Sequence, residues 1–381
     1  MTFRIKGLSL PAAVVFVATS GYAQAAPAVS VHTFATGGPV GASQPDSITV
    51  ADRTVWVEYG NGADSTGAMG NSTIVQYSLS GAILHTYTIP GLADGLKFNP
   101  TTGMVWALQN NDGNSTLSLI NPTTGTISGP LKYAAPPYVY GPTSARGYDD
   151  VAFLNGKVFL SVSNPVNPPD PVVQMLNQGN TPSGTLTTTD VLTAVKTNPA
   201  FTDSTLVPPD IDSLKSTPSG QLVLTSEGDG LGPGFATSDG RYTLISNPGT
   251  ASQSVMNLRV TNAAGVNVNA MDDVLFPGAT VGTLYVADTK TNTVYALVLT
   301  GLDPNTPIIS LGSFNEVGLV NPTTGVVEMS LLGNLPAPHG LDFLPNSTAV
   351  PEPPIWVMLL AGFLGLVAVR VGGGCPRGSF R

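Results

Sequence analysis

Acidic residues recur at the start of segments that have the periodicity of β-strands. The starts are Asp46, Asp94, Asp149, Asp212 and Asp272, and His339 takes the same position in a sixth segment. After each start, apolar and polar residues alternate, which is typical of a strand with a buried face. Several carboxylates gathered in one place favour a hard cation, most simply Ca²⁺, which takes about six to eight oxygen ligands. The six residues are therefore candidate metal ligands.

Two further arrangements would also resolve the crowding of these carboxylates. Like charges about 4 Å apart repel by roughly 4 kcal/mol at an effective dielectric near 20. Some of the carboxylates could be protonated with a raised pKa. Others could accept hydrogen bonds from backbone N–H groups of a neighbouring repeat, which would make them structural residues. His339 likewise fits a hydrogen-bonding role as well as a ligand role.

The segments that position these residues are predicted β-hairpins. Five starts lead through a turn into a second strand, in the order "TVWVEY", "MVWAL", "KVFLSV", "QLVLTS" and "TLYVAD". Asn155-Gly156 supplies the positive φ angles of a two-residue hairpin turn. The fifth hairpin is predicted to join residues 272–276 to "TLYVAD" across "PGATVG", while the sixth start has no second strand after it. "NPTTG" occurs at Asn99, Asn121 and Asn321, which indicates duplication of one unit.

The spacing of the starts predicts an all-β propeller. Intervals of 48 to 67 residues allow four strands per repeat. We predict six blades over residues 26–345, with seven as the alternative and a β-sandwich pair or β-helix as other architectures. The N-terminal "VSVHTF" should pair into the last blade and close the ring. The repeat rhythm resembles that of NHL-repeat and gluconolactonase-like propellers, and the second family implies a central divalent cation used in hydrolysis.

A propeller would bring a second set of polar residues to the same face. If the first strands line the axis, their starts lie at one mouth of the channel, and the antiparallel second strands return to it. The residues at those returning ends are candidate ligand-binding residues: Glu58, Gln109, Asn164, Glu227 and Asp288.

Both ends of the chain carry targeting patterns. Residues 1–25 have a basic start, an apolar stretch and an A-x-A site, which predicts a secretory signal peptide. Residues 346–354 form a Pro-rich linker, and residues 355–371 are predicted to be a transmembrane helix followed by a short basic cytoplasmic tail, 372–381. The linker contains Val350, Pro351, Glu352 and Pro353.

This motif, the short apolar helix and the arginine after it resemble the PEP-CTERM sorting signal of Gram-negative bacteria. The resemblance implies recognition by an exosortase and delivery to the cell surface, outer membrane or extracellular matrix after transient anchoring in the inner membrane. The basic residues after Arg370 are scattered, whereas that family has a tight cluster. A simple membrane anchor without processing is the alternative.

Charge and composition exclude further classes of function. Residues 26–349 hold 10 Lys and Arg against 23 Asp and Glu, a net charge of −13, which disfavours nucleic acid as a partner. Cys375 is the only cysteine, so a disulfide framework is excluded. We expect a surface or matrix protein that binds a polysaccharide or a protein, and binding is favoured over catalysis. The alternatives are a divalent-metal-dependent hydrolase or lactonase and a purely structural matrix protein.

Overall fold

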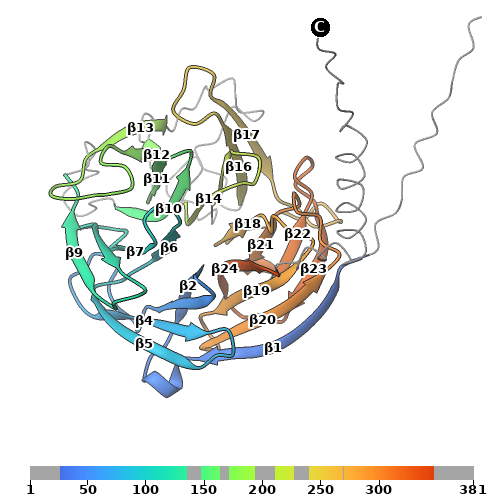
Figure 1. Ribbon diagram of the computed structural model, residues 1–381. Coiled ribbons are helices and arrows are strands. Elements are labelled where there is room, and N and C mark those ends of the chain that lie inside the picture. Colours follow the sequence, from blue (N-terminus) through green and yellow to red (C-terminus); the bar gives the residue numbers. More distant parts are fainter. Residues whose placement is uncertain are drawn as a thin grey trace, which may run out of the picture.

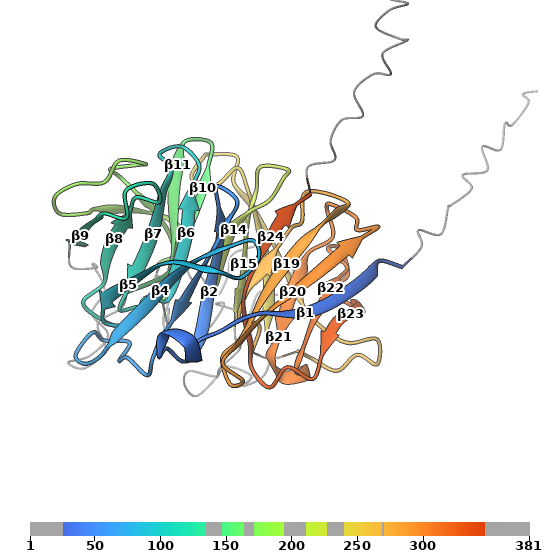
Figure 2. The ribbon, with the colours of Figure 1, turned by 60° about the horizontal axis from the view of Figure 1, so that its bottom comes forward.

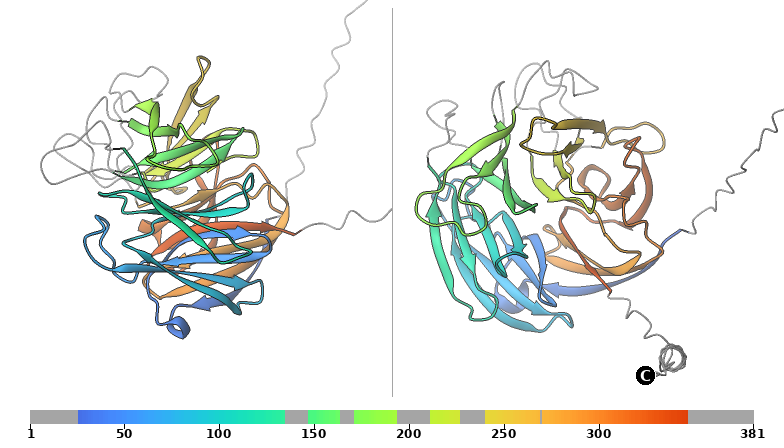
Figure 3. Two further views of the ribbon diagram at one scale, coloured as in Figure 1. Left: turned by 60° about the vertical axis from the view of Figure 1, so that its left-hand side comes forward. Right: turned by 45° about the horizontal axis from the view of Figure 1, so that its top comes forward.

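The described part of the chain forms a ring of β-sheets around a central axis. A computed structural model describes residues 26–134, 147–163, 171–193, 211–226, 240–268 and 270–346. These residues form six four-stranded antiparallel sheets, arranged as the blades of a propeller (Figure 1). The two further views in Figure 3 show the same ring from its side and from above. The prediction of a six-bladed all-β propeller is confirmed.

The first four blades follow the chain in order, from the axis outwards. Blade 1 contains β2 (Pro45–Ala51), β3 (Thr54–Tyr59), β4 (Asn71–Ser78) and β5 (Ile83–Pro90). Blade 2 contains β6 (Gly95–Asn99), β7 (Met104–Gln109), β8 (Thr116–Ile120) and β9 (Ile127–Lys132). Blade 3 contains β10 (Tyr148–Leu154), β11 (Lys157–Val162), β12 (Pro171–Leu176) and β13 (Thr188–Thr193). Blade 4 contains β14 (Ser213–Ser216), β15 (Leu222–Ser226), β16 (Arg241–Ser246) and β17 (Ser254–Arg259).

The strands of the last two blades are interleaved in the order of the chain. Blade 5 contains β18 (Val274–Leu275), β21 (Ile308–Leu311), β22 (Glu316–Val320) and β23 (Val327–Gly333). Blade 6 contains β24 (Pro338–Pro345), β19 (Val281–Asp288), β20 (Thr293–Thr300) and β1 (Ala28–Thr36). The chain leaves blade 5 after its first strand, forms the two middle strands of blade 6, and then returns. The predicted fifth hairpin is therefore wrong, because β18 pairs with β21 while "TLYVAD" pairs with β24.

The N-terminal strand closes the ring. β1 pairs antiparallel with β20 and forms the outer edge of blade 6, where it runs beside β20 (Figure 2). Strands from both ends of the described chain thus lie in one sheet, as the sequence predicted. Two short 3₁₀ helices, η1 (Gly38–Val40) and η2 (Gly312–Phe314), lie in the connections after β1 and β21.

The hydrophobic core lies between the blades rather than inside one of them. Successive side chains of a strand point to opposite faces, so each blade packs against both of its neighbours. In β3, Val55 and Val57 join the cluster shared with blade 6, whereas Trp56 joins the cluster shared with blade 2. Trp106 packs in the same way against blade 3. This alternation explains why the second strands are apolar almost throughout.

The turns follow the predicted local chemistry. Asn155 and Gly156 both have positive φ, and they connect β10 to β11. In each "NPTTG" segment the side chain of the Asn accepts hydrogen bonds from the backbone N–H groups two and three residues later. The segment at Asn99 connects the first two strands of blade 2, whereas those at Asn121 and Asn321 connect the last two strands of their blades. One turn sequence therefore serves two positions in the blade.

The targeting segments lie outside the described residues. These include residues 1–25, the linker beyond Asn346 with its Pro-Glu-Pro motif, and the apolar run after it. Within the residues that the structure describes, no helix has the length and apolar character needed to cross a membrane.

Candidate functional site

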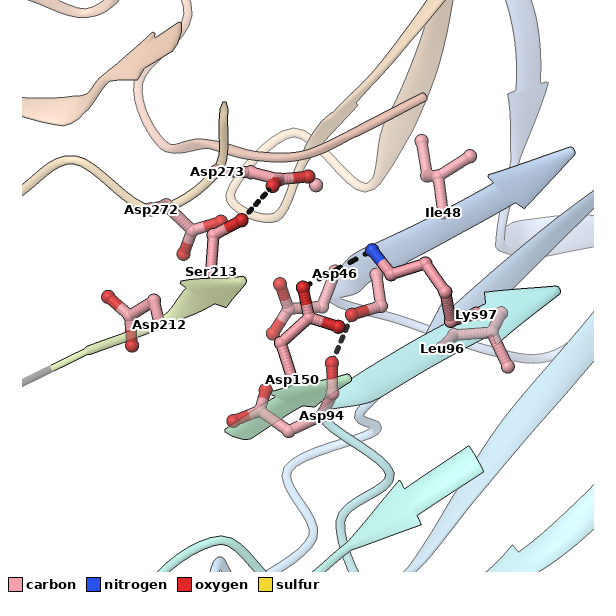
Figure 4. Close-up of a pocket in the computed structure, with 12 residues that line it drawn as sticks. Asp46, Ile48, Asp94, Leu96, Lys97, Asp150, Asp212, Ser213, Asp272 and Asp273 are labelled. Carbon is pink, nitrogen blue, oxygen red and sulfur yellow. Dashed lines mark hydrogen bonds and ion pairs between the residues drawn. The ribbon is translucent and has the colours of Figure 1, made fainter. Parts of the chain in front are cut away.

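The starts of the innermost strands gather at one mouth of the central channel. Asp46, Asp94, Asp212 and Asp272, which come from four different blades, line a small hollow on the axis (Figure 4). Its volume is about 30 Å³, enough for a water molecule or a single ion. The structure thus brings four of the six predicted starts together around one axis. We call this hollow and the side chains around it the acidic mouth.

His339 lies between two of the aspartates. Its Nδ1 is 2.9 Å from Oδ1 of Asp272 and 3.2 Å from Oδ1 of Asp46. Burial disfavours the charged imidazolium, but the two carboxylates outweigh it and raise the pKa of His339 well above its usual value. At neutral pH a protonated His339 therefore supplies the positive charge that holds the two carboxylates together.

Burial also disfavours the charged form of the carboxyl groups at and beside the acidic mouth. Burial and the nearby charge of Asp46 raise the pKa of both Asp94 and Glu58 well above the usual range. Glu58, at the end of β3, is wholly buried. Among the described residues neither of its oxygens has a partner in normal hydrogen-bond geometry, and only nearby Ser72 favours its charged form. Burial also raises the pKa of Asp272 to about 6, although His339 opposes this.

Deeper in the channel, a girdle of polar contacts ties each blade to the next. Four side chains on the first strands each accept a hydrogen bond from a backbone N–H of the following blade. The pairs are Thr49 with Phe98 (3.0 Å), Asp150 with Leu214 (3.1 Å), Asp273 with Leu341 (2.6 Å) and Asp342 with Val50 (2.7 Å). Each of the three aspartates also caps the N–H of the residue after it in its own strand.

Two lysines complete this girdle at the remaining blade interfaces. Nζ of Lys97, in blade 2, is 3.2 Å from Oδ2 of Asp150 in blade 3. Nζ of Lys215, in blade 4, is 2.6 Å from Oδ2 of Asp273 in blade 5. Despite burial, Lys215 and Lys97 hold the pKa of Asp273 below its usual value. These ion pairs neutralise the two buried aspartates of the girdle, Asp150 and Asp273, whereas Asp342 is half-buried.

Two of the arrangements considered for the crowded carboxylates occur in the structure, but at different residues. Bonding to the backbone of the next blade does occur, but at Asp150, Asp273 and Asp342, one or three positions after the predicted starts. At the acidic mouth itself, raised pKa values are found instead. Asp149 does not line the hollow; it is buried, and its neighbour Asp150 takes its place there.

The predicted ligand-binding residues also differ from one another. Glu58 faces the acidic mouth. Gln109 is occupied by other contacts: it accepts from Ser118 Oγ of its own blade (2.7 Å) and donates to the carbonyl of Pro90 in blade 1 (2.7 Å). Asp288 is buried and accepts from the backbone N–H groups of Lys290 and Thr291. Asn164 and Glu227 lie outside the described residues.

Three side chains of the acidic mouth are close enough to hold one ion. A carboxylate oxygen of Asp46, one of Asp272 and a ring nitrogen of His339 all lie within 4.8 Å of one another. Asp94 and Glu58 add further carboxylates next to Asp46. This oxygen-rich donor set fits a hard divalent cation, whose charge would replace that of the imidazolium.

Comparisons with known proteins give only distant structural similarities. No protein-family model matches the chain, and no curated protein matches it in sequence. Solved structures with a similar fold include a protein from Lactobacillus plantarum (12% identity, 79% of this chain and 88% of that one, TM-score 0.44). A putative gluconolactonase is similar over 72% of this chain and 94% of its own (11% identity, TM-score 0.40). A protein of unknown function from Bacteroides caccae shares 10% identity over 79% and 87% of the two chains, with a TM-score of 0.44.

Proposed function

We propose that this protein is an exported β-propeller that binds a divalent cation, most simply Ca²⁺, at the acidic mouth and recognises a polysaccharide or protein partner there. The observation that carries the proposal is the convergence of Asp46, Asp272 and His339 beside a wholly buried Glu58, whose charged form is favoured only by Ser72 among the described residues. Buried carboxylates without hydrogen bonds need either a proton or a cation. A cation would satisfy several of them at once.

Asp46 and Asp272 would hold the ion, with Asp94 and Glu58 as further oxygen ligands. His339 would lose its proton or turn aside, because an imidazolium repels a cation. Protons and the cation therefore compete for the site, and the affinity for the cation should rise as the pH rises.

Loops beside the acidic mouth supply surface for a partner. The loop between β3 and β4 is joined to the loop after β7 by a hydrogen bond from Ser65 to Asp112 (2.7 Å) and another from Asn114 to the carbonyl of Thr66 (3.2 Å). Second strands end at the acidic mouth, so both loops lie on that face. Their hydroxyl, amide and carboxylate groups suit the hydroxyls of a polysaccharide, and a protein partner is the other possibility for this rim.

The predicted targeting segments support a surface location. A signal peptide would export the chain, the Pro-Glu-Pro motif would present it to an exosortase, and the apolar run would hold it in the inner membrane until then. The cell surface, outer membrane or matrix of a Gram-negative bacterium is the proposed destination. Intact mass of protein released from cells tests this, because a C-terminus that still reaches Arg381 would contradict processing.

Calcium titration of chelated protein tests the cation site. We expect heat of binding and a rise in Tm for the wild type, both reduced at least tenfold in apparent affinity by Asp272→Asn. Asp303→Asn, a matched change on an exposed loop, should leave the affinity unchanged. Absence of binding in the wild type, for Ca²⁺ and for Mn²⁺ and Zn²⁺ alike, would overturn the proposal.

A metal-dependent hydrolase or lactonase is the second candidate. The observation that favours it is that Asp212 lines the same hollow as the proposed ion ligands, where its carboxylate could accept a proton from a metal-bound water. The test is turnover of lactones and esters with and without EDTA. Turnover that EDTA abolishes would favour the enzyme, whereas calcium-dependent stabilisation without turnover would favour a binding protein. A purely structural matrix protein would show neither.

A further inference from the structure

A second, larger cavity lies at the other end of the channel. Its volume is about 260 Å³, and its lining residues come from the far ends of the innermost strands. Since those strands begin at the acidic mouth, this cavity belongs to the opposite face. Its apolar walls include Val50, Phe98, Phe153, Leu275 and Phe276. We call it the aromatic cavity.

Lys97 and Lys215 line the inner end of the aromatic cavity. Each ammonium group has three hydrogens to donate. The contacts of Lys97 with described residues account for one of these, to Asp150. Those of Lys215 account for two, to Asp273 and to the carbonyl of Leu341 (2.5 Å). Donors of both lysines therefore remain for an acceptor at the inner end of the cavity.

The charges around the aromatic cavity favour an anion. Asp150 and Asp273 line the hollow on the mouth side, so the two lysines lie between these carboxylates and the cavity. Asp342 is the only acidic residue among those that line the cavity, and its two oxygens already accept from the N–H groups of Val50 and Phe343. A ligand carboxylate would meet two ammonium groups, each already paired with one aspartate on its other side, and one occupied carboxylate.

We propose that the aromatic cavity binds a small carboxylate with an apolar body, such as an arylacetate or a short branched acid. The carboxylate accepts hydrogen bonds from Lys97 and Lys215, and the apolar body packs against the three phenylalanines. A volume of about 260 Å³ is below the roughly 300–1,000 Å³ of pockets for drug-sized ligands, which limits the body to about one ring. The site is independent of the cation proposed for the acidic mouth.

The test compares probes of equal shape and different charge. Phenylacetate, phenethylamine and 2-phenylethanol are titrated into the purified full-length protein and followed by calorimetry and ligand-observed NMR. EDTA is present throughout, so that a cation at the acidic mouth cannot contribute. We expect saturable binding of phenylacetate at least tenfold tighter than that of either other probe. Equal or tighter binding of the amine or alcohol, or no saturation by about 10 mM phenylacetate, would overturn the proposal.

Variants of residues that line the aromatic cavity test where phenylacetate binds. Lys97→Met should abolish it, but that change leaves Asp150 buried without its ion pair and could unfold the protein. Ser216→Trp avoids this difficulty, because Ser216 is an exposed residue on the rim of the cavity. The indole should obstruct the opening and weaken phenylacetate binding at least tenfold with an unchanged Tm. Ser80→Trp, on an exposed turn of blade 1, is the matched control. Equal affinities of the two tryptophan variants would place the ligand elsewhere.

Discussion

The carboxylate of Asp342 accepts a 2.7 Å hydrogen bond from the backbone N–H of Val50, 292 positions earlier in the chain. Its other oxygen accepts from the N–H of Phe343 at 2.8 Å. Blade 6 is therefore joined to blade 1 at the axis by one side chain as well as by packing. The girdle around the channel closes at this contact.

Replacing Asp342 should weaken the ring. Asp342→Ala leaves two backbone N–H groups without their acceptor, and each such group costs about 1–3 kcal/mol. We expect the free energy of unfolding in urea to fall by about 2–5 kcal/mol. Asp303→Ala, on an exposed loop, should change it by less than about 1 kcal/mol. Equal losses in the two variants would contradict a structural role for this carboxylate.

The Lys215–Asp273 ion pair should be costly to break from one side. Lys215→Met leaves Asp273 buried and unpaired, which typically destabilises a protein by about 3–5 kcal/mol. Adding Asp273→Asn should recover part of this loss in a double-mutant cycle. Lys290→Met, an exposed lysine, is the control. Strictly additive losses, measured by urea unfolding, would show that the two side chains do not interact.

The stability of the chelated protein should decrease from mildly acidic to alkaline pH. The pKa of Asp272 is raised to about 6, and those of Asp94 and Glu58 are raised well above the usual range. Between about pH 4 and these values the folded state binds more protons than the unfolded state, so the free energy of unfolding falls as the pH rises. The raised pKa of His339 adds stability that is complete below about pH 6.5 and is lost as the pH rises through its folded value.

Urea unfolding at about pH 5, 6.5 and 8 in EDTA checks this prediction. His339→Gln should flatten the curve, whereas His85→Gln, at an exposed position, should leave it unchanged. The lowered pKa of Asp273 acts in the opposite direction, but only below about pH 4. A free energy of unfolding that rises over this range would contradict the charge arrangement of the acidic mouth.

Calcium should offset the loss of stability that we expect at alkaline pH. A ligand that binds only the folded state stabilises it by about 2.7 kcal/mol at 100 times its dissociation constant. Because the proton on His339 opposes the cation, the calcium-dependent rise in Tm should be larger at about pH 8 than at about pH 5. A rise of equal size at both pH values would show that the cation binds away from His339.

Blades 5 and 6 should open as one unit. Because β19 and β20 are inserted between β18 and β21 in the chain, unfolding either blade disrupts the strand order of the other. Hydrogen exchange should therefore give similar opening free energies for β21 and β19, distinct from those of β7. Independent exchange of β21 and β19 would contradict this coupling.

Much of the fold is predictable because strand periodicity and turn chemistry are local properties. The fifth hairpin could not be predicted in this way, since "TLYVAD" suits the second strand of either blade. Tertiary packing decides between them. Tyr285 of β19 packs in the core shared with blade 1, and Val286 packs in the core shared with blade 5, which places β19 in blade 6. The pairing of β18 is only two residues long and carries little sequence signal.

The sequence predicted which face of the propeller carries the candidate site and that the site lies around the central axis. The sequence did not predict which of two successive aspartates, Asp149 or Asp150, lines the hollow. The reason is that the register of β10 with β11 shifts between Tyr148 and Val151. Such irregularities re-aim a side chain, and a shift of one residue moves it to the other face. The sequence did contain a signal for Asp150 and Asp273, since each follows another aspartate. Lys97 and Lys215 occupy alternating positions that look solvent-exposed, and only ring closure buries them.

Both ends of the described chain leave blade 6 at the same end of its strands, although β1 is the outermost strand and β24 the innermost. Ala28 pairs with Thr300, which pairs with Val281, and the N–H of Asn346 donates to the carbonyl of Val281 at 3.0 Å. These strand ends lie on the face of the propeller that carries the aromatic cavity. Fixing the protein to a sensor chip, a bead or a bilayer at Ala28 or Asn346 would consequently turn the acidic mouth towards the surrounding liquid and the cavity towards the support.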